Sequence, residues 1–261
     1  MTISDYKNHA ELLLKEYGLC TGVICGILAC KMVYDLSQLI SALSFKGYSS
    51  LSRMQQVEWN NRAISTLHAV FITIVSLYLT FCSDLFADSQ QQDLVIFRHS
   101  SFSTFILGVS VGYFLSDIGM IFWFYPSLGG MEYVLHHFLS MSGLIYAVST
   151  GLGQVYAYMI LVSETTTPGI NLRWYLDVAG LKRTKAYVVN GVAIFFTWLV
   201  ARIILFLYLF YHVFLHYDEI VQLPSFGFFL IIVGPVALAF LNLMWFGKIT
   251  KGMLKTLAKR H

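Results

Sequence analysis

Long apolar segments recur along this chain, and they constrain its fold more than any other feature. A helix that crosses a lipid bilayer needs about 20 mainly apolar residues. Segments of this character predict spans at residues 19–43, 63–81, 102–124, 133–148, 152–162, 187–210 and 226–245. Without a turn at residues 149–151, the fourth and fifth would form one helix too long for a bilayer. The sequence therefore predicts an all-α membrane protein with about seven transmembrane helices.

The low charge of the chain supports this prediction. Only 12% of its residues are charged, whereas soluble domains carry about 25%, so lipid must cover much of the surface. A formal net charge of +3 is too small to indicate a nucleic-acid partner. Residues 1–18 are polar and lack the apolar core of a cleaved signal peptide, so we expect the first span to be retained.

Lysine and arginine gather on alternate connections, which predicts the orientation of the helices. Residues 46–62, residues 172–186 and the C-terminal tail are basic, whereas two of the intervening connections are acidic. The acidic side chains are Asp84, Asp88, Asp93, Asp218 and Glu219, and the basic tail carries Lys248, Lys251, Lys255, Lys259 and Arg260. Because basic connections face the cytosol, we predict a lumenal N-terminus and a cytosolic C-terminus.

Several ionisable side chains fall within the predicted spans, where burial in lipid is costly and each marks a candidate site. One set recurs at steps of three along one side of the second span. It consists of Trp59, Arg62, Ser65 and His68. The same set fits an interfacial Trp/Arg anchor beside a hydrogen-bonded histidine. Asp117 lies deep in the third span with Tyr113 on the same face, and its alternative role is a structural hydrogen bond to a neighbouring helix.

A pair of histidines, His136 and His137, opens the fourth span at its cytosolic end. Neighbours on a helix point about 100° apart, so one ring can face a cavity while the other braces a neighbouring helix. Glu164 precedes Pro168, which tends to end a helix, so we expect this carboxylate near the cytosolic face. We predict that His68, His136, His137 and Glu164 line one cavity open to the cytosol, with Asp117 somewhat deeper.

The motifs of several enzyme classes are missing from the sequence. None of the four cysteines forms a Cys-x-x-Cys pair, and there is no Gly-x-Ser-x-Gly, His-Glu-x-x-His or P-loop sequence. The one His-x-x-x-His motif, His212 and His216, falls at the opposite membrane face from the histidine pair, and we interpret it as a lumenal polar rim. We therefore predict no metal site and no cofactor.

Two features near the first span are left open by the sequence. Lys31 and Asp35 are four residues apart on one helix face, which fits a self-neutralising pair as well as a functional one. Cys20 and Cys82 fall at the same membrane face, so they can either form a disulfide or remain free thiols.

Six stretches of sequence, in order, resemble the TLC-domain family, which includes the ceramide synthases. They are residues 58–69 (EWNNRAISTLHA), 112–121 (GYFLSDIGMI), 135–137 (LHH), 163–174 (SETTTPGINLRW), 185–191 (KAYVVNG) with Arg202, and 241–246 (LNLMWF). The Glu-x-x-x-Pro run that leads to Arg-Trp resembles the TLC domain-containing protein 4 branch. On this basis we expect a lumenal N-terminus and first helix at residues 1–49, a TLC domain at 50–255 and a basic cytosolic tail at 256–261.

The resemblance implies six helices that enclose a narrow lipid-accommodating cavity, with the first span outside them. It also implies residence in the endoplasmic reticulum or a related endomembrane, and a role in lipid homeostasis. In ceramide synthases the paired histidines and later acidic residues serve acyl transfer from acyl-CoA, and His136 and His137 match that pair. The ceramide synthases carry a His-Asp cluster where this chain has Ser163, Glu164 and three threonines, so ceramide synthesis itself is not expected.

Three hypotheses for function follow. In the first, the cavity binds a membrane lipid or an acyl chain without catalysis. In the second, the protein is an acyltransferase with fatty acyl-CoA as substrate, in which His136 or His137 is the base or nucleophile and Asp117 or Glu164 orients the imidazole. In the third, it is a trafficking or scaffold partner of other membrane proteins. The candidate lipid- and headgroup-binding residues are Trp59, Arg62, Ser65, His68, Tyr113, Arg173, Trp174, Arg202 and Asn242.

Overall fold

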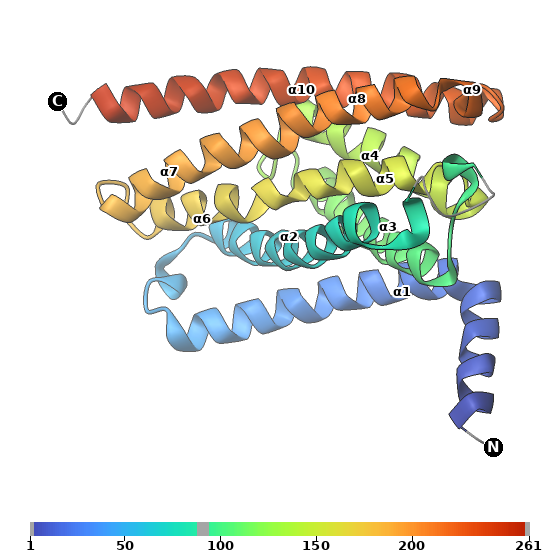
Figure 1. Ribbon diagram of the computed structural model, residues 1–261. Coiled ribbons are helices and arrows are strands. Elements are labelled where there is room, and N and C mark those ends of the chain that lie inside the picture. The colour runs from blue at the N-terminus through green and yellow to red at the C-terminus, as the bar shows by residue number, and fades with distance from the viewer. Residues whose placement is uncertain (1–2, 88–93, 259–261) are drawn as a thin grey trace.

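The computed structural model describes residues 3–87 and 94–258, and every regular element in these ranges is helical. This confirms the predicted all-α fold. The long helices lie side by side in one bundle, and the N-terminal part of α1 turns away from it (Figure 1). Asp88, Asp93, Lys259 and Arg260, which contributed to the predicted orientation, lie outside the described residues.

The helices follow the predicted spans in order. They are α1 (Ile3–Ser44), α2 (Arg53–Leu77), α3 (Ser101–Trp123), α4 (Met131–Thr150), α5 (Gln154–Leu161), α6 (Thr167–Val178), α7 (Lys185–Trp198), α8 (Leu205–Leu215), α9 (Tyr217–Ile220) and α10 (Ser225–Ala258). Short π-helices, Tyr78–Cys82 and Leu199–Ile204, extend α2 and join α7 to α8. A 3-10 segment, Val162–Thr166, joins α5 to α6, and single 3-10 turns occur at Tyr48–Ser50, Asp84–Phe86 and Val95–Phe97.

Five helical segments of the described chain are long and apolar enough to cross a membrane. They are Tyr17–Ser44, Arg53–Cys82, Ser101–Trp123, Lys185–Leu215 and Ser225–Lys255. The α5–α6 segment runs alongside them (Figure 1), and all but one residue of α5 are buried by protein. A helix that faces protein does not need the hydropathy of one that faces lipid. The short α5 therefore does not need a long apolar run of its own.

The end of the fifth span is the main correction to the sequence prediction. We expected the helix to end at residue 162, but it continues from Gln154 through Val162–Thr166 to Val178. Pro168 follows the 3-10 segment and occupies the first turn of α6, a position at which proline is common. Glu164 therefore lies in the middle of a continuous helical segment and not near its cytosolic end.

Helix α1 lies outside the bundle and contacts α3 through glycines. Gly22 and Gly26 of α1 face Gly108 and Gly112 of α3, and their Cα atoms approach so closely that a Cβ at Gly26 or Gly112 would overlap a backbone carbonyl oxygen of the other helix. Two Gly-x-x-x-Gly runs thus meet, which is a common way for membrane helices to pack without a hydrophobic driving force.

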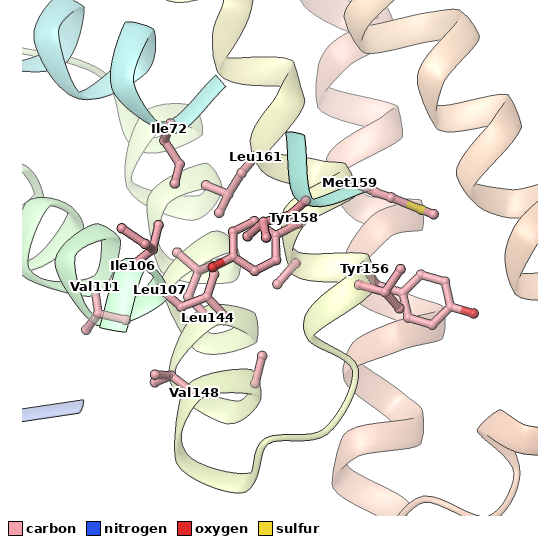
Figure 2. Packing of buried hydrophobic residues seen from close by; sticks show 14 of the residues in the cluster. Ile72, Ile106, Leu107, Val111, Leu144, Val148, Tyr156, Tyr158, Met159 and Leu161 are labelled. Carbon is pink, nitrogen blue, oxygen red and sulfur yellow. The ribbon is translucent and has the colours of Figure 1, made fainter. Parts of the chain in front are cut away.

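The main apolar cluster lies at the end of the bundle where α3 begins. Tyr158 is fully buried among Leu107, Leu144 and other side chains of the cluster (Figure 2), and its hydroxyl donates a hydrogen bond to the backbone oxygen of Ser103 at 2.6 Å. Gln154 accepts from Ser103 Oγ at 2.7 Å and further fixes α5 against α3. This packing leaves the opposite end of the bundle, where α3 ends and α4 begins, for polar side chains.

Candidate functional site

A cavity of about 520 Å³, here called the polar chamber, lies between α2, α3, α4, α6 and α10. Its wall contains eight of the residues that the sequence singled out. They are Arg62, Ser65, Tyr113, Asp117, His136, His137, Glu164 and Arg202. Asn61, Tyr133, Thr166, Asn171, Trp198, Trp245 and Lys248 also line it. The structure thus brings together residues that are far apart in sequence.

The two neighbouring histidines have different surroundings, as helical geometry predicts. Both ring nitrogens of His137 are engaged: Nε2 lies 3.0 Å from Asp117 Oδ2, and Nδ1 lies 3.0 Å from the backbone oxygen of Tyr133. Asn61 Nδ2 donates to Asp117 Oδ1 at 3.0 Å, which fixes the orientation of its amide. The buried Asp117 carboxylate is therefore satisfied, and His137 has no nitrogen left for a ligand.

His136 differs from its neighbour in making no side-chain hydrogen bond within the described chain. Its Nδ1 is enclosed by protein and has no partner among the described residues. A ligand can therefore reach the ring only through Nε2. The ring packs edge-on against Trp245, with centroids 5.3 Å apart. An unpaired buried nitrogen is costly, and such exceptions are where a ligand or an ordered water is expected.

Arg202 lies in the π-helix Leu199–Ile204, a feature that occurs frequently at functional sites. Its Nε donates to Thr166 Oγ1 at 2.9 Å and Nη1 donates to Asn242 Oδ1 at 3.2 Å. Nη2 lies 3.6 Å from Glu164 Oε1, which is beyond hydrogen-bonding distance. Glu164 Oε2 accepts from Thr167 Oγ1 at 2.8 Å. The guanidinium is therefore charge-paired but retains N–H groups with no acceptor.

Arg62 connects α2 to α6. Two of its nitrogens donate to Glu58 Oε1 at 2.7 and 3.0 Å, and Nη1 donates to Asn171 Oδ1 at 2.9 Å. Asn171 Nδ2 in turn donates to Ser65 Oγ at 2.8 Å, and the Arg62 guanidinium lies over the ring of Trp174 at 4.8 Å. The carboxylate and the amide take most of its donors, so Arg62 fixes the helix pair as well as lining the chamber.

Five predicted binding residues do not line the chamber. His68 stacks on Tyr113 with ring centroids 3.8 Å apart, behind the chamber wall. Asn242 accepts a hydrogen bond from Arg202 but does not itself line the chamber. The other three belong to the end of the bundle near α6. Trp59 donates from Nε1 to Ser41 Oγ and meets Trp174 edge-on, while Arg173 lies over the Tyr187 ring at 4.0 Å.

A second cavity of about 60 Å³, here called the apolar pocket, adjoins the polar chamber. His136 and Glu164 appear in the walls of both cavities. The remainder of the apolar pocket is formed almost entirely by apolar and small side chains of α4, α5 and α10. These include Leu139, Gly143, Leu144, Leu152, Ile160, Gly234 and Leu238. A polar volume and an apolar volume therefore meet at His136.

The other open features of the sequence have simple structural settings. All four cysteines are free, and Cys20 and Cys82 are exposed. Lys31 and Asp35 pair with each other on an exposed face of α1. His212 and His216 stack with centroids 4.4 Å apart, and no group of three or more His, Cys, Asp or Glu residues in the described ranges is arranged to hold a metal ion.

The fold and site define a multi-pass, all-α membrane protein with a polar chamber and an apolar pocket joined inside one helical bundle. A sequence model of the TLC domain matches residues 58–251, and the chain therefore belongs to the TLC-domain family. It is 26% identical to human TLC domain-containing protein 4 over 236 residues, 87% of this chain and 86% of the relative.

Further relatives support this assignment. The chain is 28% identical to Xenopus laevis TLC domain-containing protein 4-B over 218 residues, 82% of this chain and 81% of the relative. It is 29% identical to Danio rerio TLC domain-containing protein 2 over 152 residues, 58% of this chain and 60% of the relative. No solved structure matches the chain.

Proposed function

We propose that this protein binds a membrane lipid or an acyl chain inside its helical bundle and serves lipid homeostasis. The observation that carries the proposal is the junction of the two cavities at His136 and Glu164. An amphiphile matches this arrangement, because its polar group can lie in the polar chamber while the part of its chain nearest that group enters the smaller apolar pocket. Ligand sites of this kind combine mostly apolar walls with a few placed polar groups.

The apolar pocket offers a direct test with a matched control. An added Cβ at Gly143, on the pocket wall, meets open space, and so does one at Gly119, which is exposed on α3. Gly143→Leu fills the pocket without a backbone clash, whereas Gly119→Leu places the same side chain outside it. We expect Gly143→Leu to lower the retained lipid about tenfold and Gly119→Leu to leave it unchanged, because only the first competes with the chain.

Native mass spectrometry of the protein purified in mild detergent measures this difference. Both variants replace a helical glycine by the same good helix former, so their effects on helix propensity are similar. Equal retention of lipid by the two variants would show that the apolar pocket is not the binding site.

Acyl transfer from acyl-CoA is a second candidate, and the free Nε2 of His136 is the observation that favours it. In this reaction Nε2 attacks the thioester carbonyl, a C–N bond forms, and the C–S bond breaks to release CoA. The acyl group then passes to an acceptor alcohol or amine. His137 is a positioning residue here, because Asp117 and the Tyr133 carbonyl oxygen occupy both of its nitrogens.

Mass spectrometry distinguishes catalysis from binding alone. If the protein is an acyltransferase, added acyl-CoA is consumed, and a covalent adduct forms that His136→Ala abolishes. If it only binds lipid, neither the wild-type protein nor His136→Ala consumes acyl-CoA, and both retain lipid. We further propose that the protein resides in the endoplasmic reticulum or a related endomembrane, as the resemblance to the TLC-domain family implies. The distribution of basic residues supports a cytosolic C-terminus.

A further inference from the structure

Each charged side chain that lines the polar chamber has an oppositely charged neighbour. Arg62 pairs with Glu58 at 2.7 Å, and His137 lies 3.0 Å from Asp117. The two remaining cations of the wall are also matched. Arg202 lies 3.6 Å from Glu164, and Lys248 lies 3.8 Å from Glu132. Each cation of the described wall therefore lies within 4 Å of a carboxylate: Glu58, Asp117 and Glu164 belong to the wall, and Glu132 lies beside it.

This balance disfavours a charged headgroup. A phosphate or carboxylate in the chamber would lie among Glu58, Asp117 and Glu164, and an ammonium would lie near Arg62 and Arg202. A charge moved from water into such a site is costly unless an opposite charge is free to pair with it. Here the opposite charges are already used, so the ligand must break an existing pair or carry no charge.

The unused hydrogen-bonding groups indicate what an uncharged ligand must supply. Arg202 carries five N–H groups, and only Nε and Nη1 donate to protein acceptors within hydrogen-bonding distance. The remaining N–H groups have no acceptor within hydrogen-bonding distance among the described residues. His136 has no hydrogen-bond partner among the described residues, so its Nε2 can pair with a hydroxyl. A carbonyl oxygen satisfies the guanidinium without adding charge.

We propose that the ligand of the polar chamber is an uncharged lipid whose headgroup carries an ester or amide carbonyl and a hydroxyl group, with the first part of its chain in the apolar pocket. This inference rests on the proposed function, because it assumes that the two cavities together bind a lipid. It adds the chemical class of the headgroup, which neither the fold nor the relatives define.

Three lipids with matched chains test the charge preference. The probes are 1-monooleoylglycerol, oleoyl lysophosphatidate and oleylamine, which are neutral, anionic and cationic. Each is added to the delipidated full-length protein in an uncharged detergent, and binding is measured by native mass spectrometry. We expect monooleoylglycerol to bind at least about tenfold more tightly than either charged lipid, because an uncompensated charge in a site of low dielectric is unfavourable.

Glu164→Gln tests the physical cause. It keeps the shape of the side chain but leaves the Arg202 guanidinium without its carboxylate. We expect the ratio of lysophosphatidate affinity to monooleoylglycerol affinity to rise about tenfold, because Arg202 becomes free to pair with an anion. Asp177→Asn removes a carboxylate that pairs with Lys182 outside the chamber, and this variant keeps the wild-type ratio.

The possible results separate the inference from the function on which it rests. If the wild-type protein binds lysophosphatidate or oleylamine as tightly as monooleoylglycerol, the headgroup assignment is wrong although lipid binding stands. If Glu164→Gln leaves the ratio unchanged, the charge balance is not the cause of the preference. If none of the three probes binds, the proposed function itself fails.

Discussion

Adjacent residues on one helix can have opposite roles, and His136 and His137 show how. His137 is held between Asp117 and a backbone carbonyl, so His137→Ala leaves a buried carboxylate without its charged partner. Breaking such a pair costs about 3–5 kcal/mol. His136 makes no hydrogen bond to the described residues, so His136→Ala removes only ring packing. We expect a large fall in thermal stability for His137→Ala and a small one for His136→Ala, measured by unfolding in detergent.

The double variant provides the control for this prediction. Asp117→Asn removes the carboxylate charge, so adding it to His137→Ala should restore much of the lost stability. Equal losses in the two single variants would contradict the different environments of the histidines.

Sequence alone suggested that one ring braces a neighbouring helix, because neighbours on a helix point in different directions. It did not show which, because the contact of His137 with Asp117 depends on how α4 is rotated against α3.

At the scale of whole elements, the contact between the glycines of α1 and those of α3 determines where α1 lies. Gly26 and Gly112 leave no space for a Cβ, whereas Gly18, also on α1, has open space around it. Forcing a larger side chain into a packed contact typically costs about 1–3 kcal/mol. We expect Gly26→Ile and Gly112→Ile to lower the unfolding temperature in detergent, and Gly18→Ile, which carries the same β-branched residue, to have little effect. Similar losses at all three positions would indicate a helix-propensity effect and not a docking contact.

The elements also show which parts of the fold the sequence can predict. Hydropathy identified the spans because lipid-facing helices must be apolar along their length. It misplaced the end of the fifth helix, because Pro168 was interpreted as a helix end although it occupies a first turn. The π-helix that carries Arg202 has no hydropathy signal, since one extra residue in a turn does not change composition. The two Gly-x-x-x-Gly runs were visible in the sequence, but their pairing was not.

At the scale of the whole molecule, polar groups and apolar packing occupy opposite ends of the bundle. The apolar cluster around Tyr158 lies where α3 begins, and the polar chamber lies where α3 ends. Lys248 at the chamber wall begins the basic end of α10. The connection between α6 and α7, which carries Lys182 and Arg183, belongs to the same predicted membrane face. If basic residues face the cytosol, the chamber lies at the cytosolic end of the bundle.

This orientation can be tested with two epitope tags in one design. A tag after His261 and a tag within residues 88–93 fall on opposite faces if the helices alternate as predicted. In cells whose plasma membrane alone is permeabilised, we expect an antibody to reach the C-terminal tag and not the internal one, and full permeabilisation to expose both. The reverse pattern would place the polar chamber on the lumenal side, where cytosolic acyl-CoA has no access. It would exclude the acyltransferase hypothesis but not lipid binding. Accessibility of both tags after partial permeabilisation would contradict the predicted number of crossings between them.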